Sequence, residues 1–302
     1  MSYDLIVIGG GPAGYVGAIR AAQLGKKVAC VEMDRAGGTC LNWGCIPTKA
    51  LLKNAELYHT LAHRADEFGL KIEGLEYDWE KVIGRSRNVS DKLAGGIEFL
   101  FKKNKIDYIK GKASIVGNST VEVELSAGGK ETHTAKHIMV ATGCKTRELP
   151  PLPFNGTSVI GSKDAMTLKK QPKEMIVIGA GAIGVEFAYF YNAYGTKVTI
   201  VEMLPNLLPV EDTDVSKALE RSFKKQKIGL KLGYKTTETK VTDNGVEITI
   251  ENAKGKTETL SADVCLVAIG VAPVLPGGKE LNLDRGFIKV NDRYETSMKG
   301  VF

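Results

Sequence analysis

The sequence is poor in several features that mark whole classes of protein. Its 302 residues include only 5 cysteines, 4 histidines and 2 tryptophans. A low and odd cysteine count in a chain of this length argues against a secreted protein held together by disulfides. No stretch of 18 or more apolar residues is free of charges and turn residues, which argues against a membrane-spanning helix. An apolar content of 43% with 25% charged residues excludes a disordered chain.

Length and charge narrow the class further. At about 150 residues per domain the chain has room for two sizeable cores and an incomplete third piece. The net charge of +6 is spread along the sequence, which favours solubility and anionic ligands but is weak evidence for nucleic acid binding. A strand-like run starts already at Leu5, leaving no room for a cleavable signal peptide, so we expect a cytoplasmic protein.

One internal repeat organises the chain. Residues 4–32 align without a gap on residues 174–202, and 12 of the 29 positions are identical. Each copy reads as a buried β-branched strand, a glycine-rich turn, a helix closed by Gly25 or Gly195, and a second strand. The repeat therefore predicts two strand–turn–helix–strand units.

The glycines of this repeat have the spacing of a dinucleotide-binding turn. They are Gly9, Gly11 and Gly14 in the first copy and Gly179, Gly181 and Gly184 in the second. In such a turn the first glycine permits the bend, the second lets the backbone approach a diphosphate, and the third lets helix and strand pack closely. Glu32 and Glu202 end the second strands, where a carboxylate binds a ribose diol. Glu202 favours NAD over NADP, because it would repel a 2′-phosphate.

The segments between the copies fit the same plan. Residues 47–64 and 78–104 are predicted to form helices, and residues 112–135 short alternating strands with turns at 117–118 and 128–129. Two further buried strands, 137–143 and 263–270, each end in a glycine. Cys30, Cys144 and Cys265 stand alone and are expected to be small core residues.

Cys40 and Cys45 form the one close cysteine pair. In an ideal helix their Cα atoms would lie roughly 8 to 9 Å apart, beyond the ~7 Å limit for a disulfide, so a bridge needs a distorted turn. Gly44 allows such a turn, and Pro47 suits the first turn of a following helix. Cys45 would then lie near a helix N-terminus, where the dipole favours a thiolate suited to exchange.

A metal site is the rival interpretation of the same cysteines. Cys40, Cys45, His59 and His63 have a spacing close to that of a zinc finger, which would make the chain a nucleic-acid-binding module. The helical sequence after Cys45 argues against it, because the 14 residues to His59 would span about 21 Å. Zinc ligands must all lie within about 2.0 to 2.3 Å of one ion. We therefore expect no metal site.

With both copies and the segment GGTCLNWGCIPTKALL in view, the sequence resembles the pyridine nucleotide-disulfide oxidoreductases over essentially its whole length. Within that family, Asn42, Pro47, Lys49, the helix GAIGVEFAYFYNAYG and Glu202 point to the members that oxidise dihydrolipoamide. Related reductases acting on mercuric ion, glutathione or another disulfide are the alternative. The resemblance implies an α/β fold with two three-layer Rossmann-like domains, the second inserted into the first, and small β-meanders. The expected domains are an FAD-binding domain at 1–148, an NAD-binding domain at 149–271, and an incomplete return to the first at 272–302.

The resemblance also implies the cofactors and their contacts. The first copy would bind FAD through its glycines and Glu32, with further contacts from Thr39, Lys49, Gly111, Ala113, Thr142 and Gly143. The second copy would bind NAD through its glycines and Glu202, together with Glu186, Val241 and Gly270. Val271 and Val274 depart from the family, which often has Arg and later Asn there, and this puts a guanidinium contact in doubt.

By the same resemblance, the catalytic residues are Cys40, Cys45, Lys49 and Glu186. Cys40 would exchange with dihydrolipoamide carried on a lipoyl protein, and Cys45 would face the flavin and pass two electrons on toward NAD⁺. Lys49 would lie beside the flavin, paired with Glu186 because an unpaired buried lysine tends to lose its charge. Family members form homodimers and take a catalytic histidine from a later domain. Since the sequence ends at Phe302, we expect a fragment that cannot complete turnover.

Overall fold

The computed structural model describes residues 2–302, which fall into two compact units. Unit 1 comprises residues up to 46 together with 88–145 and 272–302, and unit 2 comprises 47–87 and 146–271. Residues 146–271 are thus inserted into unit 1, as expected from the sequence. Two helices and two short paired strands run from one unit into the other: α3 (Cys45–His63), α4 (Trp79–Lys103), β6 (Cys144–Thr146) and β15 (Val271–Pro273).

Unit 1 is built on a six-stranded sheet in the order β16-β3-β2-β1-β5-β4. Its elements are β1 (Ser2–Ile8), α1 (Pro12–Gln23), β2 (Val28–Glu32), α2 (Gly38–Trp43), β3 (Asp107–Gly117), β4 (Thr120–Leu125), β5 (Lys130–Val140), β16 (Gly277–Gly278), β17 (Leu283–Asp284) and β18 (Phe287–Ile288). The central strands are parallel, and β4 joins β3 to β5 as an antiparallel meander. The repeat's strand–turn–helix–strand prediction is therefore confirmed for the first copy.

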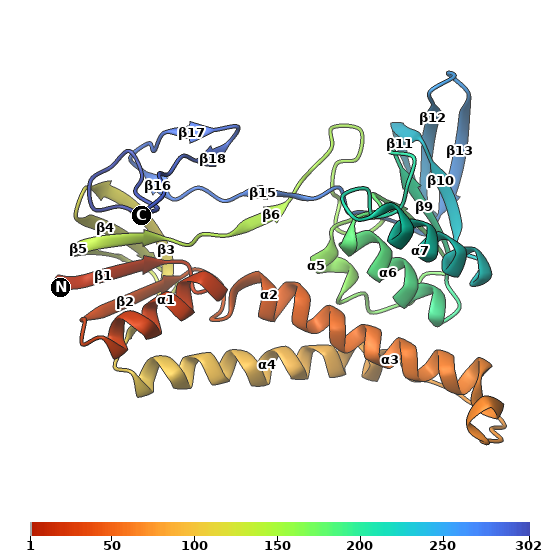
Figure 1. Cartoon of the computed structure of the whole chain (residues 1–302), viewed down its shortest axis with the longest axis horizontal. Helices are drawn as coiled ribbons and strands as arrows, with labels where there is room; N and C mark the ends of the chain where they lie inside the picture. Colours follow the sequence, from red (N-terminus) through yellow and green to blue (C-terminus); the bar gives the residue numbers. More distant parts are fainter. Residues whose placement is uncertain (1) are drawn as a thin grey trace. The chain divides into compact units, whose positions relative to one another are not determined.

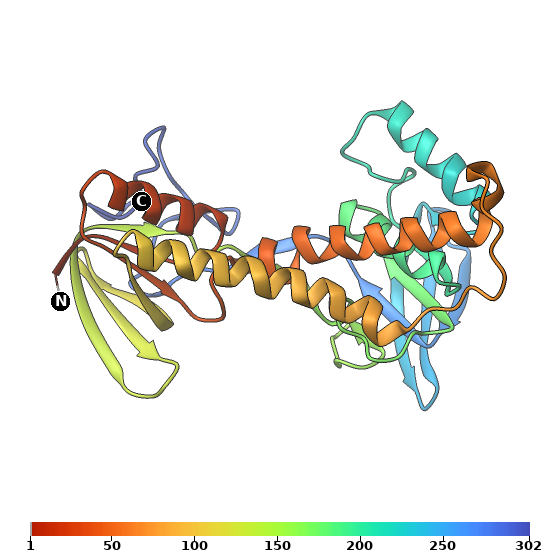
Figure 2. The ribbon, with the colours of Figure 1, turned by 90° about the horizontal axis from the view of Figure 1, so that it is seen from below.

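Successive side chains along the strands of unit 1 point to opposite faces of the sheet, and both faces are buried. Val7 and Cys30 pack with Ala18 of α1 and Phe101 of α4, so these helices cover one face (Figures 1 and 2). On the opposite face a second cluster includes Val301 and the partly buried Leu281 and Met298 from the end of the chain. This alternation produces the three layers expected of a Rossmann-like unit.

Unit 2 repeats the arrangement around a five-stranded parallel sheet in the order β10-β9-β8-β14-β7. Its elements are η1 (Ala65–Phe68), β7 (Val159–Ile160), α5 (Ser162–Ala165), β8 (Glu174–Ile178), α6 (Ala182–Ala193), β9 (Lys197–Glu202), α7 (Thr213–Lys225), β10 (Gly229–Leu232), β11 (Tyr234–Thr242), β12 (Gly245–Asn252), β13 (Thr257–Ala262) and β14 (Val264–Val267). One face packs against helices and the other against the three-stranded sheet β11-β12-β13, whose Ile248 and Ile250 are fully buried.

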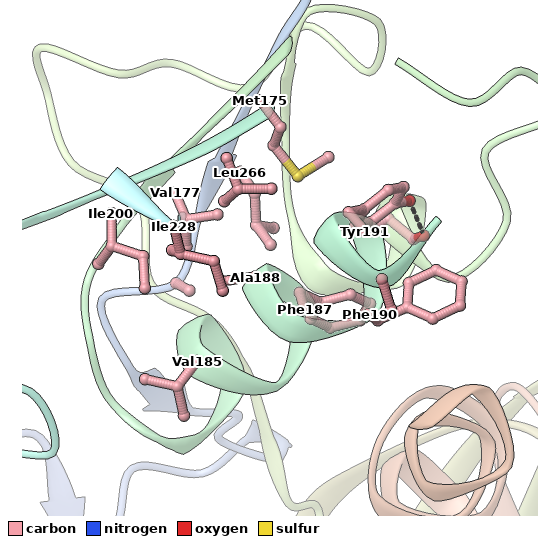
Figure 3. Close-up of a cluster of buried hydrophobic side chains, with 14 of the residues drawn as sticks. Met175, Val177, Val185, Phe187, Ala188, Phe190, Tyr191, Ile200, Ile228 and Leu266 are labelled. Carbon is pink, nitrogen blue, oxygen red and sulfur yellow. Dashed lines mark hydrogen bonds between the residues drawn. The ribbon is translucent and has the colours of Figure 1, made fainter. Parts of the chain in front are cut away.

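The helix face of unit 2 is rich in aromatic side chains. Phe187, Phe190 and Tyr191 of α6 pack on Val177, Ile200 and Leu266 of the sheet (Figure 3). The buried Tyr191 hydroxyl donates to the carbonyl oxygen of Ala165 at 2.5 Å, which satisfies its one polar atom. This aromatic core anchors the helix that carries Glu186.

The unit boundaries differ from the expected domain at 1–148. Residues 47–87 belong to unit 2, because Leu51 and Ala55 of α3 share a core with α6, and Trp79 of α4 packs on Phe190. The predicted helices at 47–64 and 78–104 are confirmed as α3 and α4. Helical periodicity shows that such a segment has an apolar face, but it does not show which sheet that face meets.

Candidate functional site

The first glycine cradle has the geometry that its spacing predicts. Gly9 has φ +104, a conformation that side chains disfavour, and a Cβ on Gly14 would lie 1.8 Å from the Gly9 carbonyl oxygen. Gly11 caps α1 in an extended conformation, and Pro12 follows as the first helical residue. The backbone N–H groups at the start of α1 therefore form an open anion-binding site of the kind that receives a diphosphate.

Glu32 is held beside this turn by two backbone donors. Its carboxylate accepts hydrogen bonds from the amides of Gly10 at 2.7 Å and Asp34 at 2.8 Å, and the residue is 8% exposed. One bond fixes the carboxylate to the glycine turn and the other fixes it to the next loop. The remaining lone pairs of its two oxygens stay available to a ribose diol.

A cavity of about 70 Å³ lies beside Glu32 within unit 1. It is lined by Gly9, Glu32, Gly111, Ala113 and Thr142, all of which the resemblance assigns to FAD. Sequence reasoning missed the rest of the lining: Ile8, Val31, Met33, Lys112, Val274, Leu275, Pro276 and Gly277. An apolar cavity next to a carboxylate that is positioned to accept from a ribose diol fits an adenosine group.

The returning segment Val274–Gly277 closes one side of that cavity. Thr142 Oγ1 donates to the Val274 carbonyl oxygen at 2.5 Å, and the Val274 amide donates to the Gly143 carbonyl at 3.0 Å. β16 then pairs with β3 through Gly277 and Ser114. Val274 takes part through its backbone groups alone, so the side chain at position 274 leaves no sequence signal for these contacts.

The second cradle reproduces the first. Gly179 has φ +102, and a Cβ on Gly184 would lie 2.0 Å from the Gly179 carbonyl oxygen. Glu202 accepts from the amides of Ala180 at 2.7 Å and Leu204 at 2.8 Å. Gly181, like Gly11, caps its helix in an extended conformation and has open space where a Cβ would be. This site also fits a dinucleotide.

The remaining residues assigned to NAD lie at different places in unit 2. Gly270, with φ +99, lies in the loop after β14. The carbonyl group of Ala268, the residue directly after β14, packs against Gly179. Val241 lies on β11 and is 56% exposed. The Arg147 side chain donates to the Val271 carbonyl oxygen at 3.4 Å.

Cys40 and Cys45 lie on two helices separated by a break at Gly44. α2 ends at Trp43, and Cys45 is the first residue of α3, so the expected distorted turn and helix N-terminus are confirmed. A Cβ on Gly44 would lie 2.9 Å from the Thr39 carbonyl oxygen and 3.3 Å from Cys40 Cα. The turn therefore folds back onto the backbone of Cys40. Cys40 is half-buried and Cys45 is exposed, and Thr39 is exposed.

The other cysteines have a different electrostatic setting. Cys30 and Cys265 are fully buried, and burial raises the pKa of each thiol to about 12. A thiol protonated up to that pH is a poor nucleophile. Cys144 is half-buried on β6. The expectation of small core residues is thus confirmed for Cys30 and Cys265, and the accessible pair remains the candidate for exchange.

Lys49 and Glu186 form an ion pair within unit 2. Lys49 Nζ of α3 lies 2.6 Å from Glu186 Oε1 of α6. The Lys49 side chain is 62% exposed, whereas a buried lysine was expected. Their pairing is present in the structure, and their roles beside a flavin stay a prediction.

Among residues 2–302, no group of three or more His, Cys, Asp or Glu side chains is arranged to hold a metal ion. His59 and His63 make an edge-to-face contact along α3, with ring centroids 4.9 Å apart. Within the same residues, no helix has both the length and the apolar character needed to cross a membrane.

Comparison with known proteins agrees with this geometry. A family model described as pyridine nucleotide-disulphide oxidoreductase matches residues 3–302. A dihydrolipoyl dehydrogenase from Chlorobaculum parvum is 42% identical over 99% of this chain, and one from Zymomonas mobilis is 43% identical over 99%. This chain spans 65% of the length of each relative.

Solved structures show the same fold. LpdA from Mycobacterium tuberculosis superposes with a TM-score of 0.89 at 26% identity, covering 99% of this chain and 66% of that one. The flavoprotein disulfide reductase RclA from Escherichia coli, solved as a Cu(II) complex, gives 0.83 at 27% identity, covering 100% and 65%. The chain belongs to the pyridine nucleotide-disulphide oxidoreductase family.

Proposed function

We propose that this chain provides the nucleotide-binding and disulfide portion of a dihydrolipoamide dehydrogenase. FAD would be held in unit 1 by the Gly9–Gly14 turn, Glu32 and the cavity beside it. NAD would be held in unit 2 by the Gly179–Gly184 turn and Glu202. The relatives that share about 42% of its residues are named dihydrolipoyl dehydrogenases, and this supports the substrate.

One observation carries the proposal. The cysteine segment starts in unit 1 at the glycine cradle itself, because Gly38 Cα packs against Gly11 and the Gly37 amide donates to the Gly10 carbonyl at 2.8 Å. The two thiols are therefore built onto the diphosphate-binding turn. A dithiol placed in this way is suited to exchange electrons with a nucleotide cofactor bound in the same unit.

The exchange step needs only the two cysteines of this chain and the two thiols of the substrate. A thiolate of dihydrolipoamide attacks Cys40 of the Cys40–Cys45 disulfide and forms a mixed disulfide, and Cys45 leaves as a thiolate. The second substrate thiolate then displaces Cys40. The substrate thus becomes a cyclic disulfide, and the protein gains two electrons and two protons as a dithiol.

The residues around the pair determine how the leaving thiolate is stabilised. Cys45 begins α3, so the positive end of that helix favours the charge. When bound, FAD would accept the two electrons and NAD⁺ would take them as a hydride. We assign Cys40 to exchange with substrate and Cys45 to the cofactor side.

The test uses the purified 302-residue chain with FAD added and measured by absorbance. We expect flavin bands and the uptake of two electrons by the cysteines per chain from dihydrolipoamide, measured as two new thiols by mass spectrometry after alkylation. Cys40→Ser should abolish that uptake, whereas Cys144→Ser should not. Oxidised glutathione and mercuric ion, assayed in parallel with NAD(P)H, test the related reductases. A parent chain in which dihydrolipoamide releases no new thiols at Cys40 and Cys45 would contradict the proposal.

A further inference from the structure

The loop Met33–Gly38 connects the nucleotide cavity to the cysteine helix α2. Met33 lines the cavity at one end, and Gly38 begins α2 at the other. The Asp34 amide donates to Glu32, and the Ala36 amide donates to the Tyr108 hydroxyl at 3.0 Å. The loop is thus tied to strands β2 and β3 of unit 1.

Asn42, which lies between the two cysteines, ties the same loop to α2. Its side chain is buried, and the amide nitrogen donates to the carbonyl oxygens of Ala36 at 3.1 Å, Gly38 at 3.0 Å and, more weakly, Arg35 at 3.4 Å. The next residue adds a tie, because Trp43 Nε1 donates to Asp34 Oδ2 at 2.9 Å. A side-chain amide has only two N–H groups, so these carbonyls share both of them.

This clamp acts on the turn that brings the cysteines together. α2 is six residues long and cannot hold its own direction, since isolated helices shorter than about 12 residues are marginal. Leu41 holds α2 against the core of unit 1, and the contacts of Asn42 and Trp43 with the loop fix its direction further. The break at Gly44 packs on Thr39 and Cys40, so a rotation of α2 would separate Cys40 from Cys45.

We propose that Asn42 is a positioning residue, which raises the effective concentration of the Cys40 and Cys45 thiols toward each other. This inference rests on the proposed function, because it assumes that the pair forms a disulfide in the reaction. Without the clamp the thiols sample more arrangements, and the disulfide becomes easier to reduce. The effect is on the disulfide equilibrium itself, beyond any effect on folding.

The test equilibrates the chain with mixtures of reduced and oxidised dithiothreitol, alkylates the free thiols, and counts the Cys40–Cys45 disulfide by mass spectrometry. In this exchange one dithiol is oxidised as the protein disulfide is reduced, with two electrons and two protons transferred. Asn42→Ala should lower the equilibrium constant for disulfide formation about tenfold, which is about 30 mV. Asn42→Asp should lower it further, because a carboxylate cannot donate to the three carbonyls.

The matched control is Asn104→Ala, which removes an amide bond to the Leu100 carbonyl at 2.8 Å in the same unit, far along the sequence from the pair. It should leave the equilibrium constant within twofold of the parent. Circular dichroism confirms that each variant is folded, and Trp43→Phe, with an expected two- to threefold decrease, decides the matter if Asn42→Ala does not fold. An Asn42→Ala equilibrium within twofold of the parent overturns this inference alone. A parent chain that forms no Cys40–Cys45 disulfide overturns the proposed function.

Discussion

The two nucleotide cradles share their geometry and differ in the segment attached to them. The first glycines have φ +104 and +102, and both acids accept from two backbone amides at 2.7 and 2.8 Å. After Glu32 the chain forms the loop to the cysteine helix, whose Gly38 packs on Gly11. After Glu202 it exposes Met203 and Leu204 before α7. The two cradles therefore have the same geometry, and the segment after the acid is what distinguishes one copy from the other.

The cover over each cradle differs as well. In unit 1 the returning segment Val274–Gly277 lines the cavity beside Glu32. In unit 2 a second cavity is lined by Met203, Gly233, Lys235, Glu251, Asn252 and Ala253, and neither Glu202 nor the glycines of the second cradle belong to its lining. We expect the site that Val274–Gly277 closes in unit 1 to release its nucleotide more slowly than the second cradle, as a bound FAD and a substrate NAD would require.

The largest expected effect comes from the third glycine of either copy. Gly14→Val or Gly184→Val would place a Cβ within about 2 Å of a backbone carbonyl, so helix and strand must separate. We expect a loss of about 3 kcal/mol in the free energy of unfolding and of nucleotide binding in that unit. Denaturant unfolding and calorimetric titration with FAD and NAD measure both.

The control for this pair is Gly95→Ala in α4, where a Cβ would meet open space. A helix interior favours alanine over glycine, so the free energy of unfolding of this variant should rise by about 0.5 to 1 kcal/mol. Each cradle variant should impair one nucleotide only: FAD for Gly14 and NAD for Gly184. Loss of both nucleotides in both variants would show that the units do not bind independently.

A second prediction separates the two acids. Glu202→Gln removes the charge that repels a 2′-phosphate, so the preference for NAD over NADP should fall about tenfold, or about 1.4 kcal/mol. Glu32→Gln should leave this ratio unchanged, because Glu32 lies in the other cradle. Dissociation constants for NAD and NADP with both variants measure the effect. A change in the NAD-to-NADP preference in Glu32→Gln would mean that NAD binds in the first copy, which contradicts the proposal.

The same comparison shows what the sequence could predict. The glycine turns, both acids and the helix break at Gly44 were predictable, because each rests on local backbone geometry that specific residues demand. The predicted strand 137–143 overlaps only the last four residues of β5, a continuous strand that pairs with β4 through residues 130–134 and with β1 through residues 134–140. Alternation of side chains continues across that change, so the sequence carries no sign of it.

Features made by distant backbone segments were not predictable. Gly300–Phe302 extends the sheet beside β5, with Val301 bridging Ile138, just as β7 lies beside β14 in unit 2. The cover at Val274–Gly277 likewise uses carbonyl and amide groups that every residue carries. Only side-chain chemistry or periodicity leaves a mark in a sequence, and apart from the Thr142 hydroxyl these contacts use neither.

A third prediction concerns alkaline pH and should affect both units. Burial, as the main cause, raises the pKa of Tyr3 and Tyr108 in unit 1 and of Tyr194 in unit 2 to about 12. Below pH 10 these rings are protonated in both the folded and the unfolded chain. Between pH 10 and 12 the unfolded chain loses protons that the folded chain keeps, so stability falls as pH rises.

Each ring contributes at most about 1.4 kcal/mol per pH unit to this fall in the free energy of unfolding, and less where the ring is half exposed. Tyr108→Phe should flatten the decline of unit 1 above pH 10, and Tyr194→Phe that of unit 2. Urea unfolding measured from pH 8 to pH 11.5 gives the slopes. Stability that is constant over this range in the parent would show that the rings ionise as freely in the folded chain as in the unfolded one.

The smallest expected effect lies where the copies differ at one aligned position. Glu186 of α6 corresponds to Val16 of α1, which is 56% exposed. Glu186→Val should change the free energy of unfolding by less than about 0.5 kcal/mol, because the Lys49 side chain of the ion pair is 62% exposed and solvent screens the attraction. Glu174→Val, which breaks the exposed pair with Lys197, is the matched control. A loss above about 2 kcal/mol in the free energy of unfolding for Glu186→Val, but not for Glu174→Val, would mean that the Lys49–Glu186 pair stabilises unit 2. The presence of this glutamate in the second copy only would then have a structural reason rather than a catalytic one.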